Sequence, residues 1–84
     1  MQPIRELLSR IRWDADFGNA EFRIGFYDRM EHSILYVSFR EIALVPGDHF
    51  SFHYIDEEGV SHSVPMHRIK EVYRNGERIW HREQ

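Results

Sequence analysis

The 84-residue sequence contains no cysteine. Small secreted domains usually depend on disulfide bonds, so this absence favours a reducing compartment and predicts a cytoplasmic location. It also excludes a zinc site built from thiolates. No apolar run approaches the roughly 20 residues of a membrane-spanning helix, and the N-terminal segment lacks the apolar core of a signal peptide. We therefore expect a protein that neither crosses a membrane nor enters the secretory route.

The chain is too short for a second hydrophobic core, and residues 1–84 are expected to form a single domain. A hydrophobic content of 42% with 14% aromatic residues is that of a folded globular protein. A domain of this size buries only about 60–65% of the surface that its unfolded chain exposes. An oligomer, or a protein partner that completes the core, therefore stays open as an alternative.

Charge is unevenly distributed along the chain, whose formal net charge is −3. Residues 1–12 carry a net charge of +2, residues 13–66 a net charge of −7, and residues 67–82 five Lys or Arg against two Glu, a net charge of +3. If the two ends meet in the fold, they form one basic face on an acidic body. Such a face, with Tyr and Trp interleaved, suits an anion that offers a flat ring for stacking, which describes a nucleotide.

The periodicity of apolar residues predicts one helix followed by three hairpins. Residues 3–12 form an amphipathic helix, because their apolar residues recur at i, i+3, i+4 and i+7 after a proline suited to the first turn. The hairpins pair 21–28 with 33–39, 49–55 with 60–64, and 71–74 with 77–82. The last turn, Asn75-Gly76, favours the two-residue type I′ conformation. The predicted fold class is α+β, with the N-terminal helix packed on a curled antiparallel sheet or small open barrel of about six short strands.

Two connecting segments and one tryptophan are less regular. Residues 40–45 form a short connection or a helical turn, and residues 67–70 either begin a strand or make a single turn. Trp13 follows the helix, and we expect it to be a core residue at the seam between helix and sheet.

The six histidines raise the question of a metal site. His49 and His53 share one face of a predicted strand, but residues four apart in a strand are separated by about 13 Å. That separation is too large for one ion, and no metal-binding helix motif accompanies these residues. We therefore expect neither a metal nor a cofactor.

Three short segments are candidates for binding an anion. His67-Arg68 follows Pro65 and can donate to phosphate oxygens, or it can serve only to cap a turn and form an edge ion pair. In Tyr27-Asp28-Arg29, Asp28 either orients Arg29 as a bidentate anion ligand or belongs to an ordinary turn.

The third candidate lies in the last predicted strand, where Trp80 shares one face with Arg78 and Arg82. Trp80 can stack a base while the two arginines reach phosphates, or it can be a core residue with the arginine stems packed around it. Ile79 is the alternative core residue on the opposite face.

These segments together resemble a small, mostly archaeal family, domain of unknown function 504, also described as an RNA cyclic group end recognition domain. The resemblance spans essentially the whole chain. The most specific part is the order of the Asp28-Arg29 turn, the Pro65-Met66-His67-Arg68-Ile69 stretch and Trp80. The other matching positions are residues 4–8, 10–14, 24–27, 39–42, 64, 70–73, Gly76, Ile79 and Arg82.

The resemblance implies a non-catalytic module that recognises RNA 3′ ends bearing a 2′,3′-cyclic phosphate, beside proteins of the RNA ligase or phosphoesterase type. The implied binding residues are Tyr27, Asp28, Arg29, Pro65, His67, Arg68, Trp80 and Arg82. Arg29 and Arg68 would hold the phosphate, His67 would donate to it, and Tyr27 or Trp80 would stack the base. One alternative is an RNA-end phosphoesterase in which His67 is the general base and His81 or Tyr27 the second acid–base group. Another is a protein-interaction or assembly module without an RNA ligand.

Overall fold

The structure is a computed structural model that describes residues 2–82. It begins with helix α1 (Ile4–Trp13), which buries the four apolar residues of the predicted stripe: Ile4, Leu7, Leu8 and Ile11. The helix ends at Asp14, whose extended backbone turns the chain away. The predicted helix is thus confirmed, one residue later at each end.

Seven strands follow, in two antiparallel sheets. A four-stranded sheet has the order β2-β1-β6-β7 and a three-stranded sheet the order β3-β4-β5. Their bounds are β1 (Phe22–Asp28), β2 (Ser33–Ser38), β3 (Ile42–Ala43), β4 (Ser51–Ile55), β5 (Ser61–Pro65), β6 (Ile69–Arg74) and β7 (Glu77–His81). Two 3-10 helices, η1 (Phe39–Glu41) and η2 (Met66–Arg68), lead into β3 and β6. The α+β class and the three hairpins are confirmed. The short strand β3 is additional, and the sheets do not close into a barrel.

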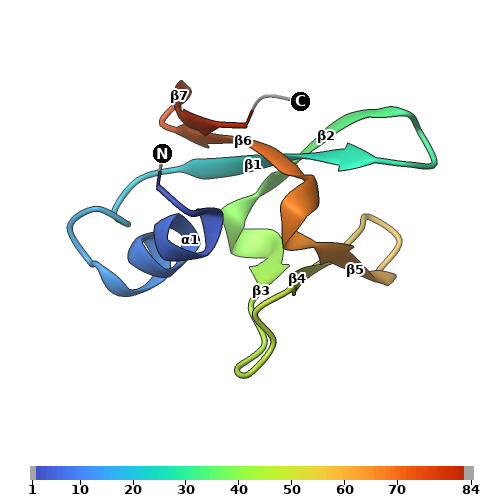
Figure 1. The fold of residues 1–84 in the computed structure, drawn as a ribbon, viewed down its shortest axis with the longest axis horizontal. Coiled ribbons are helices and arrows are strands. Elements are labelled where there is room, and N and C mark those ends of the chain that lie inside the picture. Colours follow the sequence, from blue (N-terminus) through green and yellow to red (C-terminus); the bar gives the residue numbers. More distant parts are fainter. Residues whose placement is uncertain (1, 83–84) are drawn as a thin grey trace.

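The core lies on one side of the four-stranded sheet. Helix α1 and the three-stranded sheet both face this side, and among residues 2–82 the opposite face is left open (Figure 1). Leu8 of α1, Ile24 and Phe26 of β1, and Phe52 of β4 belong to one buried cluster. The ring of Phe26 lies edge-on to that of Phe52, with centroids 5.6 Å apart, and so joins the two sheets.

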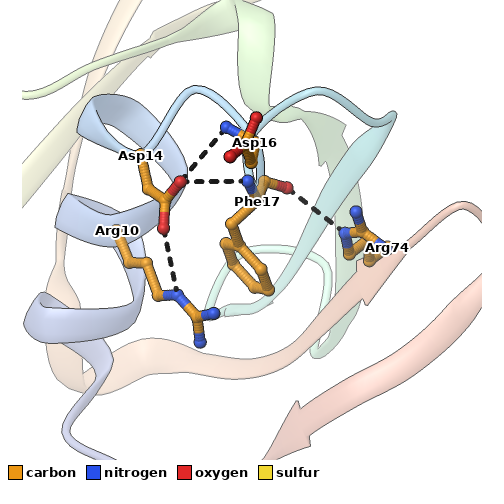
Figure 2. A network of polar contacts seen from close by, with 5 residues as sticks. All are labelled: Arg10, Asp14, Asp16, Phe17 and Arg74. Atoms are coloured by element: carbon orange, nitrogen blue, oxygen red, sulfur yellow. Dashed lines mark hydrogen bonds and ion pairs between the residues drawn. The ribbon is translucent and has the colours of Figure 1, made fainter.

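The loop after α1 is fixed by a network of polar contacts (Figure 2). One carboxylate oxygen of Asp14 accepts the N–H groups of Asp16 and Phe17, each at 3.1 Å, and the other lies 3.7 Å from Nε of Arg10. Nε of Arg74 donates to the carbonyl of Phe17 at 3.3 Å. The guanidinium carbons of Arg10 and Arg74 lie 3.9 and 5.3 Å from the centre of the Phe17 ring. Phe17 is therefore the residue that closes the seam between helix and sheet.

Trp13 does not take that place. Its side chain is 77% exposed, so the expectation of a core residue is wrong. The reason is local: the helix ends at the next residue, and the capping turn directs Phe17 toward the core. The guanidinium carbon of Arg12 lies 5.5 Å from the Trp13 ring, which it partly shields at the surface.

Strand β4 begins two residues later than predicted. The carboxylate of Asp48 accepts the N–H groups of Phe50 and Ser51 at 3.0 and 3.2 Å and the Ser51 hydroxyl at 2.6 Å. These bonds hold residues 48–51 in a turn and lower the pKa of Asp48, the Ser51 hydroxyl having the largest effect. Phe50, which the alternating pattern placed in the strand, is consequently 83% exposed.

The last hairpin contains a bulge that changes which residues share a face. Its Asn75-Gly76 turn has positive φ at both residues, 49° and 84°, as a type I′ turn requires. Trp80 lies opposite Val72, but Arg78 lies opposite Tyr73, so Ile79 is an extra residue. Arg78 therefore points to the opposite face from Trp80, and the prediction that they share one face is wrong.

Candidate functional site

The two basic ends of the chain meet in the structure. Nε1 of Trp80 donates to the carbonyl of Gln2 at 2.7 Å, which places β7 beside the start of α1. Figure 1 shows the N-terminal segment running up toward β7. Arg5 from α1 and Arg82, which follows β7, line the same cleft. The two basic ends therefore contribute to one cleft through Arg5 and Arg82, whereas Arg78 of the last hairpin lies outside this cleft.

This cleft, which we call the basic cleft, has a volume of about 650 Å³. It lies between the first turn of α1, residues 49–51 and η2. Its cationic or titratable side chains are Arg5, His49, His67 and Arg82. Ile4, Phe50, Ser51, Ser63, Pro65 and Met66 complete the lining. Within the described residues 2–82, this lining contains no Asp or Glu, although the whole chain is acidic.

The wall of the basic cleft is built from η2 and its attachment to β4. Pro65, the last residue of β5, pairs with Ser51 and leads into η2. The N–H of Met66 then donates to the carbonyl of Phe50 at 2.7 Å, which ties η2 to the turn before β4. Met66 is buried, His67 is exposed and Arg68 is half-buried. The ambiguous segment 67–70 is thus a single turn followed by the start of β6.

Arg82 is held against this wall. Its Nη1 donates to the carbonyl of His67 at 2.8 Å, and its guanidinium carbon lies 5.2 Å from the centre of the Trp80 ring. Its own N–H donates to the carbonyl of Lys70 at 2.9 Å. The structure therefore brings His67, Trp80 and Arg82 together, and it fixes Arg82 before any ligand arrives.

Trp80 belongs to the core rather than to the surface of the cleft. It is 6% exposed, while Ile79 is 37% exposed, which decides between the two alternatives left open by the sequence. An indole buried to this extent has no free face on which a base can stack. The stacking role considered for Trp80 is therefore not available, and Trp80 acts by supporting Arg82.

The segment Tyr27-Asp28-Arg29 lies at the turn between β1 and β2. Asp28 accepts the N–H of Met30 at 2.8 Å, a turn contact, and the hydroxyl of Tyr27 lies 3.4 Å from Nδ1 of His32. Arg29 is exposed, and none of the three residues lines the basic cleft. β1, whose last two residues are Tyr27 and Asp28, contacts η2, the 3-10 helix that carries His67.

Arg68 lies on η2 next to His67 but outside the lining of the basic cleft. Within residues 2–82, no hydrogen bond or ion pair occupies its guanidinium, so the edge ion pair considered for it is not formed.

Two exposed aromatic residues border the site, and sequence reasoning missed both. Phe50 lines the basic cleft. Trp13 lines an adjoining pocket of about 370 Å³, which shares Arg5, His49 and Met66 with the cleft. Trp13 was expected in the core, and Phe50 was expected in an alternating strand. Their proximity to Asp48 and Asp14, residues typical of turns, was the signal that could have corrected this assignment.

Among residues 2–82 there is no group of three or more side chains placed to hold a metal ion. His49 lines the basic cleft, whereas His53 lies on β4 opposite Ser63.

A cleft with cationic side chains, no carboxylates and neighbouring exposed rings is typical of a small domain that binds a phosphorylated nucleotide. The chain belongs to the family of the MJ1316 RNA cyclic group end recognition domain, whose model matches residues 1–82. The family is named for the recognition of cyclic groups at RNA ends, which agrees with a non-catalytic module that binds RNA ends. No curated protein and no solved structure matches the chain. No helix within residues 2–82 is long and apolar enough to cross a membrane.

Proposed function

We propose that the basic cleft binds the 3′-terminal nucleotide of an RNA that ends in a 2′,3′-cyclic phosphate. The observation that carries this proposal is the gathering of Arg5, His49, His67 and Arg82 in one cleft without a carboxylate, in a chain of net charge −3. An anion that enters the cleft meets cationic or titratable side chains on several sides, whereas the carboxylate of Asp48, which accepts hydrogen bonds from Phe50 and Ser51, lines the adjoining pocket. The net negative charge of the chain disfavours extensive contact with a long RNA backbone, so contacts beyond the terminal nucleotide are expected to be few.

The cleft offers chemistry suited to a cyclic phosphate. This group carries one negative charge on two non-bridging oxygens, which a guanidinium can contact in a bidentate manner. Arg82 is already held by the carbonyl of His67, so its remaining donors lose little freedom on binding. Arg5 approaches from α1, and His67 donates to the phosphate or to the cyclised ribose. A phosphate monoester carries more negative charge, which cationic side chains alone would favour, so selection of the cyclic form rests on the shape of the group and on the contact of His67 with the cyclised ribose.

The exposed rings supply stacking surfaces. Phe50 lies inside the basic cleft and contacts the terminal base. Trp13, in the adjoining pocket with Arg5 and His49, contacts the preceding base. Bases at a single-stranded end are unstacked and available for such contacts. The site thus reads an end rather than a duplex.

The other residues implied by the family resemblance stay predictions. Arg68 and Arg29 are candidates for contacts with the oxygens of the terminal phosphate from beside the cleft, with Asp28 orienting Arg29 and Tyr27 stacking a base. We also propose a cytoplasmic location, because the chain has no cysteine, and partners of the RNA ligase or phosphoesterase type. The oligomeric state stays open.

The test is direct binding of one short labelled RNA in three forms, with a 2′,3′-cyclic phosphate, a 3′-phosphate or a 3′-hydroxyl, at two salt concentrations. We expect selective binding of the cyclic form. Arg82→Ala and His67→Ala should each weaken it by about 10- to 150-fold, the equivalent of roughly 1.5–3 kcal/mol for a charge-assisted contact. Arg40→Ala is the control, because Arg40 is exposed and outside the cleft. Equal affinity for the three forms, or binding of none, would overturn the proposal.

A second candidate function is hydrolysis of the cyclic phosphate. It is favoured by one observation, the presence of both His49 and His67 in the cleft. Hydrolysis requires a base to activate water and an acid to protonate the ribose oxygen that leaves phosphorus. Incubation of the cyclic RNA with stoichiometric protein tests it. Formation of a phosphate monoester that is lost in both His49→Ala and His67→Ala would establish an enzyme, and unchanged RNA would retain the binding module.

A further inference from the structure

The open face of the four-stranded sheet carries a second, separate arrangement of aromatic and charged residues. Gly25 of β1 lies opposite Tyr36 of β2 on one side and opposite Glu71 of β6 on the other. These residues form one row across three strands, on the face opposite α1. The hydroxyl of Tyr36 crosses β1 and donates to Oε1 of Glu71 at 2.6 Å.

The Tyr36 ring therefore lies along the sheet over Gly25. A Cβ atom at Gly25 would lie 2.8 Å from Cε1 of Tyr36, so the ring occupies the space that any other residue would fill. Tyr36 is still 46% exposed. One side of the ring rests on backbone, and its other side is available to a ligand.

The Tyr36 ring is held in place by the carboxylate of Glu71, which accepts hydrogen bonds from three side chains. The second oxygen of Glu71 accepts Nη1 of Arg78 at 3.1 Å and the Tyr73 hydroxyl at 3.3 Å. The bond from Tyr36 is the main cause of the lowered pKa of Glu71, and it raises the pKa of Tyr36 to about 12. The Tyr36 and Tyr73 ring centres lie 6.1 Å apart. Donors from three strands thus fix the position of both rings before any ligand binds.

Positive charge flanks the rings. Arg23 pairs with both Ser38 and Tyr73, and Tyr73 pairs with Arg78, which gives a second row across the same face. Arg78 reaches this face because of the bulge at Ile79. Arg23 and Arg78 are both exposed. The only carboxylate in the two rows, that of Glu71, already accepts three hydrogen bonds.

We propose that this face binds an unpaired nucleotide of the RNA strand that leads to the recognised end, with the base stacked on Tyr36 and the backbone phosphate contacted by Arg23. Four-stranded sheets that present aromatic rings between cationic residues stack bases in this way. A protein partner is less suited, because the centre of a protein interface is depleted of charged residues, whereas the centre of this face is a charged network. The inference rests on the proposed function, because the ligand of the sheet face is the RNA whose end the basic cleft binds.

The experiment compares two RNAs with the same cyclic 3′ end, a dinucleotide and a strand of roughly ten nucleotides. Wild-type protein should bind the longer RNA more tightly. Tyr36→Ala should weaken binding of the longer RNA by about 5- to 150-fold, the usual effect of removing one stacked base, and should leave the dinucleotide unaffected. Tyr36→Phe keeps the ring and should retain most of the affinity. Arg23→Ala should weaken the longer RNA alone, and Arg40→Ala is the matched control.

The failures of the two proposals are distinguishable. Binding of the dinucleotide, and its loss in Arg82→Ala, tests the basic cleft. A loss of affinity in Tyr36→Ala that is confined to the longer RNA tests the sheet face. Circular dichroism of each variant confirms that it is folded. Wild-type affinity of folded Tyr36→Ala for the longer RNA would overturn the sheet proposal, as would failure of wild-type protein to bind either RNA.

Discussion

The burial of Trp80 gives a prediction that separates a structural role from a binding role. An aromatic side chain of this size removes about 150–250 Å² from water, and Trp80 is 6% exposed. It also donates to the Gln2 carbonyl at 2.7 Å. Trp80→Ala should lower the free energy of unfolding by about 3–5 kcal/mol, the sum of lost burial and the cavity that remains. Trp80→Phe keeps part of the ring and loses the hydrogen bond, so we expect a loss of about 1–3 kcal/mol.

These losses must be set against the stability of the whole domain. Domains are stabilised by roughly 0.05–0.15 kcal/mol per residue, which is about 4–13 kcal/mol for a chain of this length. Trp80→Ala therefore risks unfolding the protein, whereas Trp80→Phe should remain folded. Urea denaturation followed by circular dichroism measures the difference, and an unchanged m-value confirms that both proteins unfold in the same manner.

Trp80→Phe is then tested in the RNA-binding assay without denaturant. A buried Trp80 predicts that Trp80→Phe binds cyclic-ended RNA within about twofold of wild type, less than 0.5 kcal/mol. Ile79→Ala is the control on the same strand, because Ile79 is 37% exposed, and it should cost less than about 1 kcal/mol. An unchanged urea midpoint together with a tenfold or greater loss of binding would refute the reasoning, since it would mean that the indole contacts RNA.

Three further predictions follow from the open sheet face and from η2. Gly25→Ala should lower the free energy of unfolding by about 1–3 kcal/mol in urea denaturation, because the added Cβ would lie 2.8 Å from Tyr36; wild-type stability would contradict the close contact. The Tyr36 phenol, followed by ultraviolet absorbance, should titrate near pH 12 and return toward 10.0 in Glu71→Gln. Because the folded-state pKa is the raised one, its contribution to stability is complete below about pH 10 and is lost as the pH rises through 12. Arg68→Ala should weaken a 3′-phosphorylated end by roughly 1.5–3 kcal/mol, and an equal loss for a 3′-hydroxyl end would show that Arg68 does not read the phosphate.

Local sequence signals were sufficient for most of the fold. The stripe of Ile4, Leu7, Leu8 and Ile11 defines a helix without reference to the rest of the chain, and all four residues are buried. The Asn75-Gly76 turn likewise requires only its own backbone preference, and its φ values of 49° and 84° agree. Strand β3 carries no such signal, because two residues show no alternation. It exists because Ile42 and Ala43 pair with Tyr54 and His53 of β4.

The errors at Trp13 and Phe50 have one physical cause. Each residue is large and apolar and lies beside a regular element, which is why Trp13 was expected in the core and Phe50 in an alternating strand. In each case a neighbouring aspartate hydrogen-bonds to the backbone and ends or delays the element. A competition between side-chain and backbone hydrogen bonds thus decides which aromatic residues become part of the surface.

The sequence predicted that the candidate site is basic, but it did not predict which residues line it. Net charge showed that both ends are basic, but it did not show that Arg5 and Arg82 line one cleft, where the hydrogen bond from Trp80 to Gln2 holds β7 beside the start of α1. The bulge at Ile79 then separates the functions of neighbouring residues on one strand: it turns Trp80 into the core and Arg78 onto the open sheet face. A strand without the bulge would place Arg78 and Trp80 on one face, and Arg78 would no longer reach Glu71. One extra residue in β7 therefore determines that the cationic residues of the last hairpin serve two surfaces, the basic cleft through Arg82 and the sheet face through Arg78.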